Sequence, residues 1–276
     1  MANFEIQKQK TITARIEKKS EIAKGTIEVI FTIEEGLFSF EPGQYVWVEL
    51  LNLNFPDPRG TRRAFSIVSD PLVKNKLSII FRISESGYKK TLISLPVGSD
   101  VHLIGPCGSF VLHDDIKIPT VFVAGGSGVA SFFCIISNEI LKKTGRELEL
   151  FYFNDNEEKS PYLKELKDLE RGSPFFKLHL FFGKLKSDDQ TIVDLFLEAY
   201  SPIKDTNLYI SGPVGMINIV DEIFSRIKIP SGSIHYEENY PSKHIGPENE
   251  KYFTRLEMFK QAVDQSLSSA STSESR

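Results

Sequence analysis

Residues 119–136, PTVFVAGGSGVASFFCII, place an apolar strand, a glycine turn and a helix directly after one another. The run 120–123 is β-branched and aromatic, which is typical of a strand buried on both faces. Gly125, Gly126 and Gly128 follow it, and apolar residues then recur at helical spacing. Glycines permit a tight turn and a close approach of a phosphate, to which a helix start offers unpaired N–H groups. A turn without a ligand has the same pattern, so this stretch alone leaves phosphate binding open.

From residue 118 onward, strand-like and helix-like segments alternate. In order they are VFVAGG and FFCIISNEILKKT, ELELFYFN and PYLKELKDLER, KLHLFFG and TIVDLFLEAY, and NLYISGP and GMINIVDEIFSRI. This rhythm predicts a doubly wound parallel α/β domain, whose ligands bind at the carboxyl ends of the strands. We expect the loops after Val123, Phe153, Phe182 and Ile210 to lie on that edge.

Residues 11–115 have a different pattern, in which short alternating runs are separated by turn residues. The predicted strands are TITARIEK, GTIEVIFTI, QYVWVELL, RAFSIVSD, KLSIIFRIS and DVHLIGP, with one helix over Tyr88–Leu95. Strands at this spacing predict an antiparallel β-barrel. The sequence thus predicts a barrel domain over 1–115 and an α/β domain over 116–246.

The remaining segment, 247–276, has a composition of its own. Phe253, Leu256, Phe259 and Val263 recur at helical spacing, which predicts an amphipathic helix over 250–264 that docks on the body of the protein. The serine-rich last twelve residues are expected to be disordered.

Composition excludes several functions. The chain has 276 residues, 41% of them hydrophobic, and a net charge of −4, which makes nucleic acid an unexpected partner. No apolar run is long enough to span a membrane, and the first residues lack a signal peptide's apolar core, so we expect a cytoplasmic protein. The two cysteines, Cys107 and Cys134, have no metal-binding spacing, and we interpret them as packed small apolar residues.

Three motifs occur in order along the two predicted domains. They are Arg63-Ala64-Phe65-Ser66, then SGYKKTL (86–92) leading to GPCGSF (105–110), and finally the glycine turn together with SGPVGM (211–216). A barrel followed by a nucleotide-type domain with these motifs resembles the ferredoxin–NADP reductase family of flavoenzymes, in the compact form that lacks an iron–sulfur domain. The resemblance covers roughly residues 10 to 240.

The resemblance implies a flavin site around the first motif. In the family the Arg contacts the flavin phosphates, the aromatic residue packs against the isoalloxazine ring, and the Ser hydroxyl bonds near flavin N5. Arg63, Phe65 and Ser66 would take these roles, with Ala64 between them. A guanidinium suits a phosphate and a flat ring suits a flat ring. An ordinary strand start with a surface Arg is the alternative.

The second motif implies a helix N-terminus against the flavin pyrophosphate. Gly87 and the amides after it suit an anion, and the lysines add charge, although a solvated helix face would also explain the lysines. Arg82 and Ile83 are expected to contribute backbone atoms. The residues assigned to this subsite are Arg82, Ile83, Gly87, Tyr88, Lys89, Lys90 and Thr91.

The third motif implies two turns that hold a nicotinamide dinucleotide. The residues assigned to it are Gly125, Gly126, Ser127, Gly128, Gly212, Pro213 and Met216, with Tyr240 as the aromatic residue near the end of the domain. Ser211 stands where the family often has Cys beside the nicotinamide. Ala130 and Ser131 stand where the family usually has a hydroxyl residue followed by Pro.

The resemblance implies an FAD-dependent NAD(P)H oxidoreductase that passes electrons to an acidic carrier such as ferredoxin or flavodoxin. Hydride transfer needs no dedicated acid or base, and Ser66 together with Glu237 or Glu238 are candidates for proton handling. An electron-transfer subunit of an oxygenase is one alternative. A binding or regulatory module that has lost turnover is another, suggested by Ala130, Ser131 and Asn239. FMN in place of FAD also stays open.

The choice of nicotinamide cofactor rests on two loops. Asp155 stands where a family Arg can hold the 2′-phosphate, and its charge would repel that group. After the next strand the chain has Gly183-Lys184-Leu185-Lys186, where an Asp would select NADH. Two ammonium groups favour NADPH as the cofactor, with NADH possible and a solvated loop as the alternative role for the lysines.

Overall fold

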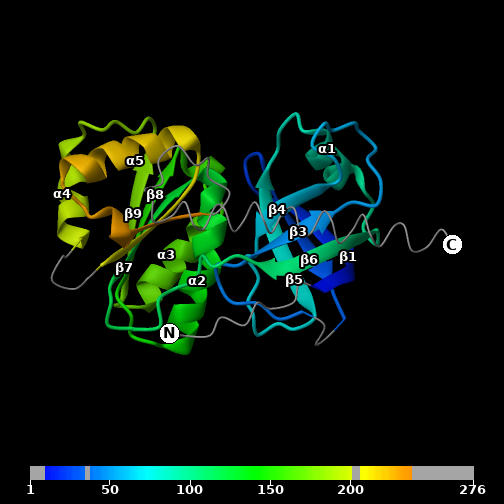
Figure 1. Ribbon diagram of the computed structural model, residues 1–276, viewed down its shortest axis with the longest axis horizontal. Helices are drawn as coiled ribbons and strands as arrows, with labels where there is room; N and C mark the ends of the chain where they lie inside the picture. The colour runs from blue at the N-terminus through cyan, green and yellow to red at the C-terminus, as the bar shows by residue number, and fades with distance from the viewer. Residues whose placement is uncertain (1–9, 35–37, 201–205, 238–276) are drawn as a thin grey trace. The chain divides into compact units, whose positions relative to one another are not determined.

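The computed structural model describes residues 10–34, 38–200 and 206–237, and two β-sheets organise them (Figure 1). The first sheet is antiparallel and has the strand order β4-β3-β6-β1-β2-β5. Its elements are β1 (Lys10–Ala23), β2 (Thr26–Thr32), β3 (Tyr45–Glu49), β4 (Arg62–Ser66), β5 (Lys76–Arg82), α1 (Gly87–Ser94) and β6 (Asp100–Cys107).

Buried and outward-facing side chains alternate along the strands of this sheet, and the sheet closes into a barrel. In β1 the residues Ile12, Ala14 and Ile16 are buried while their neighbours face outward, so one face of the sheet forms the core. The first and last strands of the order meet where an antiparallel bridge joins Ile67 to Ile79. The barrel therefore closes on an interior of aliphatic and aromatic side chains.

The second sheet is parallel and has the order β11-β10-β7-β8-β9. Its elements are β7 (Thr120–Gly125), η1 (Gly126–Gly128), α2 (Val129–Lys142), β8 (Leu148–Asn154), η2 (Glu157–Lys159), α3 (Leu163–Gly172), β9 (Phe176–Phe182), α4 (Gln190–Ala199), β10 (Asn207–Ser211), α5 (Val214–Arg226), η4 (Ser231–Ser233) and β11 (Ile234–Tyr236).

Helices cover both faces of this parallel sheet (Figure 1). On one face Phe122 of β7 packs against Phe132 of α2, with ring centroids 4.8 Å apart. On the other face Phe151 of β8 stacks on Phe196 of α4 at 4.3 Å, and Phe196 contacts Phe224 of α5. The chain runs outward from β7 through β8 to β9 and then returns to β10 on the other side of β7. The strand order thus reverses between β7 and β10, where the loops that follow the two strands lie beside each other.

The predicted fold, an antiparallel barrel followed by a doubly wound parallel domain, is confirmed. The predicted helix over Tyr88–Leu95 is observed as α1, one residue earlier at each end. The short strand β11 is an addition that the sequence pattern did not predict. The predicted C-terminal helix over 250–264 and the serine-rich tail lie outside the described residues.

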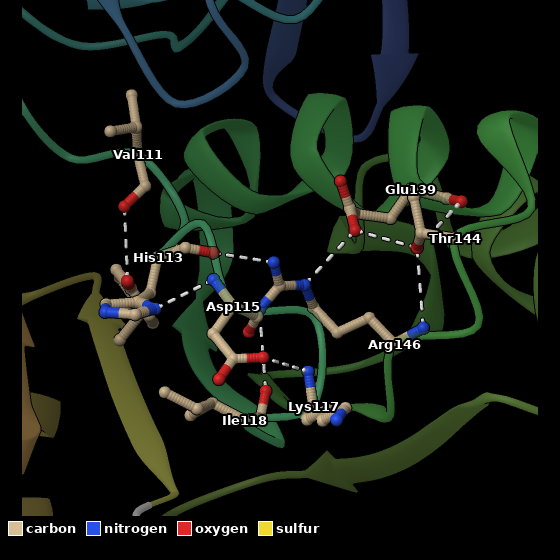
Figure 2. Close-up of polar contacts among 9 residues, drawn as sticks. Val111, His113, Asp115, Lys117, Ile118, Glu139, Thr144 and Arg146 are labelled. Atoms are coloured by element: carbon tan, nitrogen blue, oxygen red, sulfur yellow. Dashed lines mark hydrogen bonds and ion pairs between the residues drawn. The ribbon is translucent and has the colours of Figure 1, made fainter.

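Buried Arg146 fixes the segment that links the two sheets (Figure 2). Its guanidinium donates hydrogen bonds to the carbonyl oxygens of His113 at 2.6 Å and Asp115 at 3.0 Å. It also pairs with the carboxylate of Glu139 in α2 at 3.2 Å. The hydroxyl of Thr144 donates a bond to the same carboxylate. One charged side chain thus ties the linking segment to the end of α2.

Replacing Arg146 with Met should lower the free energy of unfolding by about 3 kcal/mol, because Glu139 and the linker carbonyls would lose a buried charged partner. Urea denaturation measures this value. Arg171→Met is the matched control, since Arg171 is 73% exposed in its ion pair with Asp168, and it should cost less than about 1 kcal/mol. Equal losses in the two variants would contradict the role given to Arg146.

Candidate functional site

The two turns that flank the reversal between β7 and β10 are in backbone contact. A Cβ atom at Gly128 would lie 2.4 Å from the carbonyl oxygen of Ser211, and one at Gly125 would lie 2.5 Å from the sulfur of Met216. Gly126 has a φ of +55°, which a residue with a side chain rarely adopts. The structure therefore brings the glycine turn 125–128 together with the second predicted turn, including Ser211, Gly212, Pro213 and Met216.

Within the described residues, the helices that leave these turns begin without a side-chain cap. The N-cap residues are Gly128 for α2 and Pro213 for α5, and neither has a side chain that accepts a hydrogen bond from a helix amide. In contrast, Asp189 caps α4 by accepting from the amides of Thr191 and Ile192. The short helix η1 runs directly into α2, and the amides at the start of η1 and of α5, which no side chain of the described residues caps, are donors suited to phosphate oxygens.

Asn154 ends β8 beside the same turn and is a residue that sequence reasoning missed. It is 7% exposed, and within the described part of the chain its amide oxygen has no hydrogen-bond partner, while the side chain lies close enough to the Tyr152 hydroxyl to oppose the rise that burial causes in the pKa of Tyr152. A buried amide of this kind is costly unless a ligand or water satisfies it. A Cβ atom at Gly126 would lie 4.0 Å from its Oδ1. Uncapped amides, a tight glycine turn and a buried amide oxygen without a partner among the described residues together fit a dinucleotide.

Arg82 reaches this turn from the barrel. The sequence assigned its backbone to the flavin, but its Nη1 atom lies 3.4 Å from where a Cβ of Gly126 would be. Arg82 also contributes, after Lys159, to lowering the pKa of Asp155. Asp155 itself is paired with Lys159 at 2.7 Å. The glycine turn therefore has a guanidinium nearby, although the loop after β8 carries an acid where the family can have Arg.

In the barrel, β4 presents its motif on two faces. Arg63 and Phe65 point inward, and Ala64 and Ser66 are half-buried on the other side. The Phe65 ring lies in the barrel core between Phe81 and Tyr88, at 5.9 and 6.1 Å. At 9% exposure it leaves little surface for a flavin ring in this conformation.

The hydroxyl oxygens of Ser66 and Ser131 lie 2.9 Å apart in a hydrogen bond. Ser131 is a buried residue of α2, one turn after the glycines. This bond joins the strand that carries the flavin motif to the helix that follows the nucleotide turn. The departure from the family pattern at Ser131 thus places a second hydroxyl next to Ser66, a pairing that sequence reasoning missed.

The residues around the start of α1 bring together hydrogen-bond donors that suit an anion, and we call this group of residues the anion pocket. Ser86 is the N-cap, and the guanidinium of Arg63 and the side chain of Asp57 meet in front of it as a buried ion pair. Arg63 also donates to the carbonyl oxygens of Arg59 and Gly60. A helix start with a buried guanidinium is the donor set that phosphate requires. The pocket therefore fits the phosphate of a flavin, although Asp57, which sequence reasoning missed, already lies in it.

The other residues assigned to the flavin phosphate subsite differ in burial and in hydrogen-bond partners. The Lys89 ammonium turns inward to the carbonyl oxygen of Arg82 at 2.9 Å, and burial, with Arg59 and Arg63 adding to it, lowers the pKa of this lysine. Lys90 pairs with Glu85 on the surface. The Thr91 hydroxyl accepts from the amide of Phe55. The buried Tyr88 donates its hydroxyl to the carbonyl oxygen of Val48, and Ile83 is exposed.

Lys184 is exposed in the loop after β9, and the amide of Gly183 in that loop donates to the carbonyl oxygen of Asn154 at 2.9 Å. Glu237 follows β11 and is half-buried, whereas Glu238, Asn239 and Tyr240 lie outside the described residues.

Among the residues that the structure describes, no group of His, Cys, Asp and Glu could hold a metal ion. No helix in that part of the chain is long and apolar enough to cross a membrane.

Comparison with known proteins identifies both halves of the described chain. Residues 13–112 match the family described as Oxidoreductase FAD-binding domain, and residues 122–222 match the Oxidoreductase NAD-binding domain. The reductase component of propane 2-monooxygenase from Mycolicibacterium goodii is 24% identical over 74% of this chain and 60% of its own length. Methane monooxygenase component C from Methylosinus trichosporium is 31% identical over 57% of this chain and 46% of its own length. The chain thus spans about 60% or less of these relatives.

The solved structures that resemble the chain share its fold. The ferredoxin-NADP+ reductase from Plasmodium falciparum superimposes with a TM-score of 0.70, at 21% sequence identity, over 82% of this chain and 95% of that one. At this identity the likeness concerns the fold.

Replacing Gly128 with Ala should lower the free energy of unfolding by about 1–3 kcal/mol, because the added methyl group would press on the Ser211 carbonyl. It should also weaken the binding of NADP+, measured by isothermal titration. Gly215→Ala is the matched control: a Cβ at Gly215, in the first turn of α5, has no neighbour within 4 Å among the described residues. That variant should be unchanged or slightly more stable. A Gly128→Ala protein as stable as the control would contradict the close packing described here.

Proposed function

The chain belongs to the ferredoxin–NADP reductase-like family of oxidoreductases, with an FAD-binding and an NAD-binding domain, and on this premise we propose that it transfers electrons from NAD(P)H to a one-electron protein carrier. The carrier is an acidic protein such as ferredoxin or flavodoxin. The observation that carries the proposal is the hydrogen bond between Ser66 and Ser131. It places the end of the flavin-motif strand against the first turns of the helix that starts at the nucleotide turn.

The chain's own residues supply binding and orientation. The Arg63 guanidinium and the start of α1 would hold the flavin phosphates, and the amides of the glycine turn with the Asn154 side chain would hold the dinucleotide. Arg82, which lies near Gly126, would add a positive charge to the dinucleotide site. Ser66 would present its hydroxyl to the reacting part of the flavin, held in place by Ser131. Bound flavin supplies the conversion of a two-electron hydride transfer into single-electron steps.

Ser211 and the carboxylates after β11 would complete the site. Ser211 is buried at the end of β10, directly against the glycine turn, and would border the nicotinamide. Glu237 and Glu238 are the candidates for handling the proton that accompanies electron transfer. Tyr240 would cover the flavin ring in place of the family's aromatic residue.

A second candidate is the reductase component of an oxygenase. The propane 2-monooxygenase and methane monooxygenase relatives favour it, and the chemistry at the flavin is the same in both cases. The two candidates differ in the acceptor. A carrier protein that is reduced as fast as the flavin itself would support the first, and reduction only in the presence of an oxygenase component would support the second.

Anaerobic addition of NADPH or NADH to the FAD-loaded protein should bleach the flavin absorption band. Ser66→Ala should bind FAD nearly as well as the parent but be reduced at least about tenfold more slowly, because a hydroxyl hydrogen bond at the reacting ring would be lost. Stopped-flow absorbance measures this rate. An FAD-loaded parent that no nicotinamide cofactor reduces would instead support a binding module without turnover.

Ser131→Ala is the matched control for Ser66→Ala. It removes the same hydrogen bond between the two serines but keeps the Ser66 hydroxyl. We expect its rate of flavin reduction to fall less than that of Ser66→Ala. Equal rates in the two variants would assign the effect to the bond between the domains and not to the hydroxyl.

We also propose that NADPH is preferred over NADH. Lys184→Ala should lower the ratio of kcat/KM for NADPH over NADH by about fivefold, since one charge pair at about 4 Å in water contributes about 1 kcal/mol. Asp155→Arg should raise the ratio, because it replaces a repulsive charge with an attractive one. A parent that favours NADH and does not respond to Lys184→Ala would overturn this assignment.

A further inference from the structure

The anion pocket at the start of α1 contains a carboxylate of the chain itself. Asp57 lies in the loop between β3 and β4, and its side chain is 4% exposed. Its Oδ2 atom accepts the backbone amide of Tyr88 at 2.9 Å and the hydroxyl of Ser86 at 2.7 Å. Its Oδ1 atom accepts the amide of Arg59 at 2.9 Å and pairs with the guanidinium of Arg63. The Tyr88 amide, the Ser86 hydroxyl and the Arg59 amide are therefore directed at one carboxylate together with one arm of the Arg63 guanidinium, whose other arm donates to carbonyl oxygens of the loop.

The surroundings hold this carboxylate in its charged form. The bonds from the Tyr88 amide, the Ser86 hydroxyl and the Arg59 amide, with the charge of Arg63, keep the pKa of Asp57 far below its usual range. A single anion thus compensates the guanidinium and the helix start. Another anion of similar size could do the same.

The loop that carries Asp57 packs directly against the start of α1. A Cβ atom at Gly87 would lie 2.1 Å from the carbonyl oxygen of Pro56 and 2.7 Å from that of Phe55, so the loop backbone lies directly on the first residue of α1. The amide of Phe55 is fixed to the Thr91 hydroxyl. A phosphate can reach the Tyr88 amide and Arg63 only if the Asp57 side chain leaves.

Capping elsewhere in the chain shows that this arrangement is particular to α1. Asp189 caps α4 from the adjacent position, as in most capped helices. The start of α1 has such a local cap as well, because the Ser86 hydroxyl accepts the Lys89 amide, but Asp57 additionally accepts the Tyr88 amide from 31 residues away in sequence and pairs with Arg63. Among the described residues, α2 and α5, which begin at the nucleotide turns, have no side-chain cap. No side chain of the described residues therefore accepts from the helix amides at the two predicted nucleotide turns, whereas the Asp57 carboxylate accepts from the Tyr88 amide at the predicted flavin phosphate site.

We propose that Asp57 competes with the flavin phosphates for one anion pocket, so that FAD binds by displacing this carboxylate from the Tyr88 amide and Arg63. The inference rests on the proposed function, because it takes the pocket to be the phosphate subsite of the flavin. Exchange of one anion for another keeps the charge of the pocket balanced in both states. The ion pair that stabilises the protein without flavin therefore limits its affinity for flavin.

Asp57→Asn tests this competition, since the amide keeps the size of the side chain and can still accept the Tyr88 hydrogen bond. The affinity of the apoprotein for FAD, measured by quenching of flavin fluorescence, should rise by about tenfold. The melting temperature of the apoprotein should fall. The affinity for riboflavin, which has no phosphate, should not change.

Asp189→Asn is the matched control, because it makes the same substitution at a helix N-cap in the other domain. It should change the melting temperature little, because Asn caps helices about as well as Asp, and leave the FAD affinity unchanged. Weaker or unchanged FAD binding in Asp57→Asn would overturn the proposal, because it would make Asp57 a residue that positions Arg63 for the phosphate. If neither the parent nor Asp57→Asn binds FAD while both remain folded, the proposed function fails together with it.

Hydrogen exchange of the parent protein gives a second test that does not depend on the variant. The Arg59 amide is protected by its bond to Asp57, so it should exchange faster once FAD is bound. Slower exchange of this amide in the FAD complex would contradict displacement, even if Asp57→Asn failed to fold.

Discussion

Each helix start leaves backbone N–H groups that need an acceptor, and the way this chain satisfies them determines where ligands can bind. In the described α/β domain, α4 uses its own Asp189, whereas α2, α3 and α5 begin without a side-chain cap. Of these, α2 and α5 flank the point where the strand order reverses. In the barrel, α1 has its own cap, Ser86, and a second acceptor, Asp57, from a distant loop. In the proposed site, the helix starts at the two turns would offer amides to the dinucleotide, whereas the Tyr88 amide at the start of α1 is already bonded to Asp57.

Close backbone packing keeps the open turns in place. Gly128 allows the Ser211 carbonyl to approach the glycine turn, and the Ser66–Ser131 bond ties that turn's helix to the barrel strand. Arg146 fixes the segment that links the two sheets through carbonyl oxygens (Figure 2). Hydride transfer depends on holding two cofactors within contact distance, so these contacts contribute to catalysis through geometry.

The elements and their order could be predicted from sequence because they follow from local patterns. The alternation of apolar and polar residues over 11–107 predicted the barrel strands. The alternation of strand-like and helix-like segments after residue 118 predicted the parallel sheet. The glycine turns could be found because only glycine tolerates such contact. Asp57, Asn154 and the partner of Ser66 could not be found in this way, since each acts on a group more than 25 residues away in sequence. Such pairings depend on tertiary packing, for which a single sequence holds no periodic signal.

A crystal structure of the FAD complex would test the central claim most directly, because it locates the phosphates and Asp57 in one measurement. The account predicts phosphate oxygens within hydrogen-bonding distance of the Tyr88 amide and the Arg63 guanidinium, with the Asp57 side chain moved out of the pocket. It would be contradicted by a complex in which Asp57 still accepts the Tyr88 amide and the flavin phosphates lie elsewhere on the barrel.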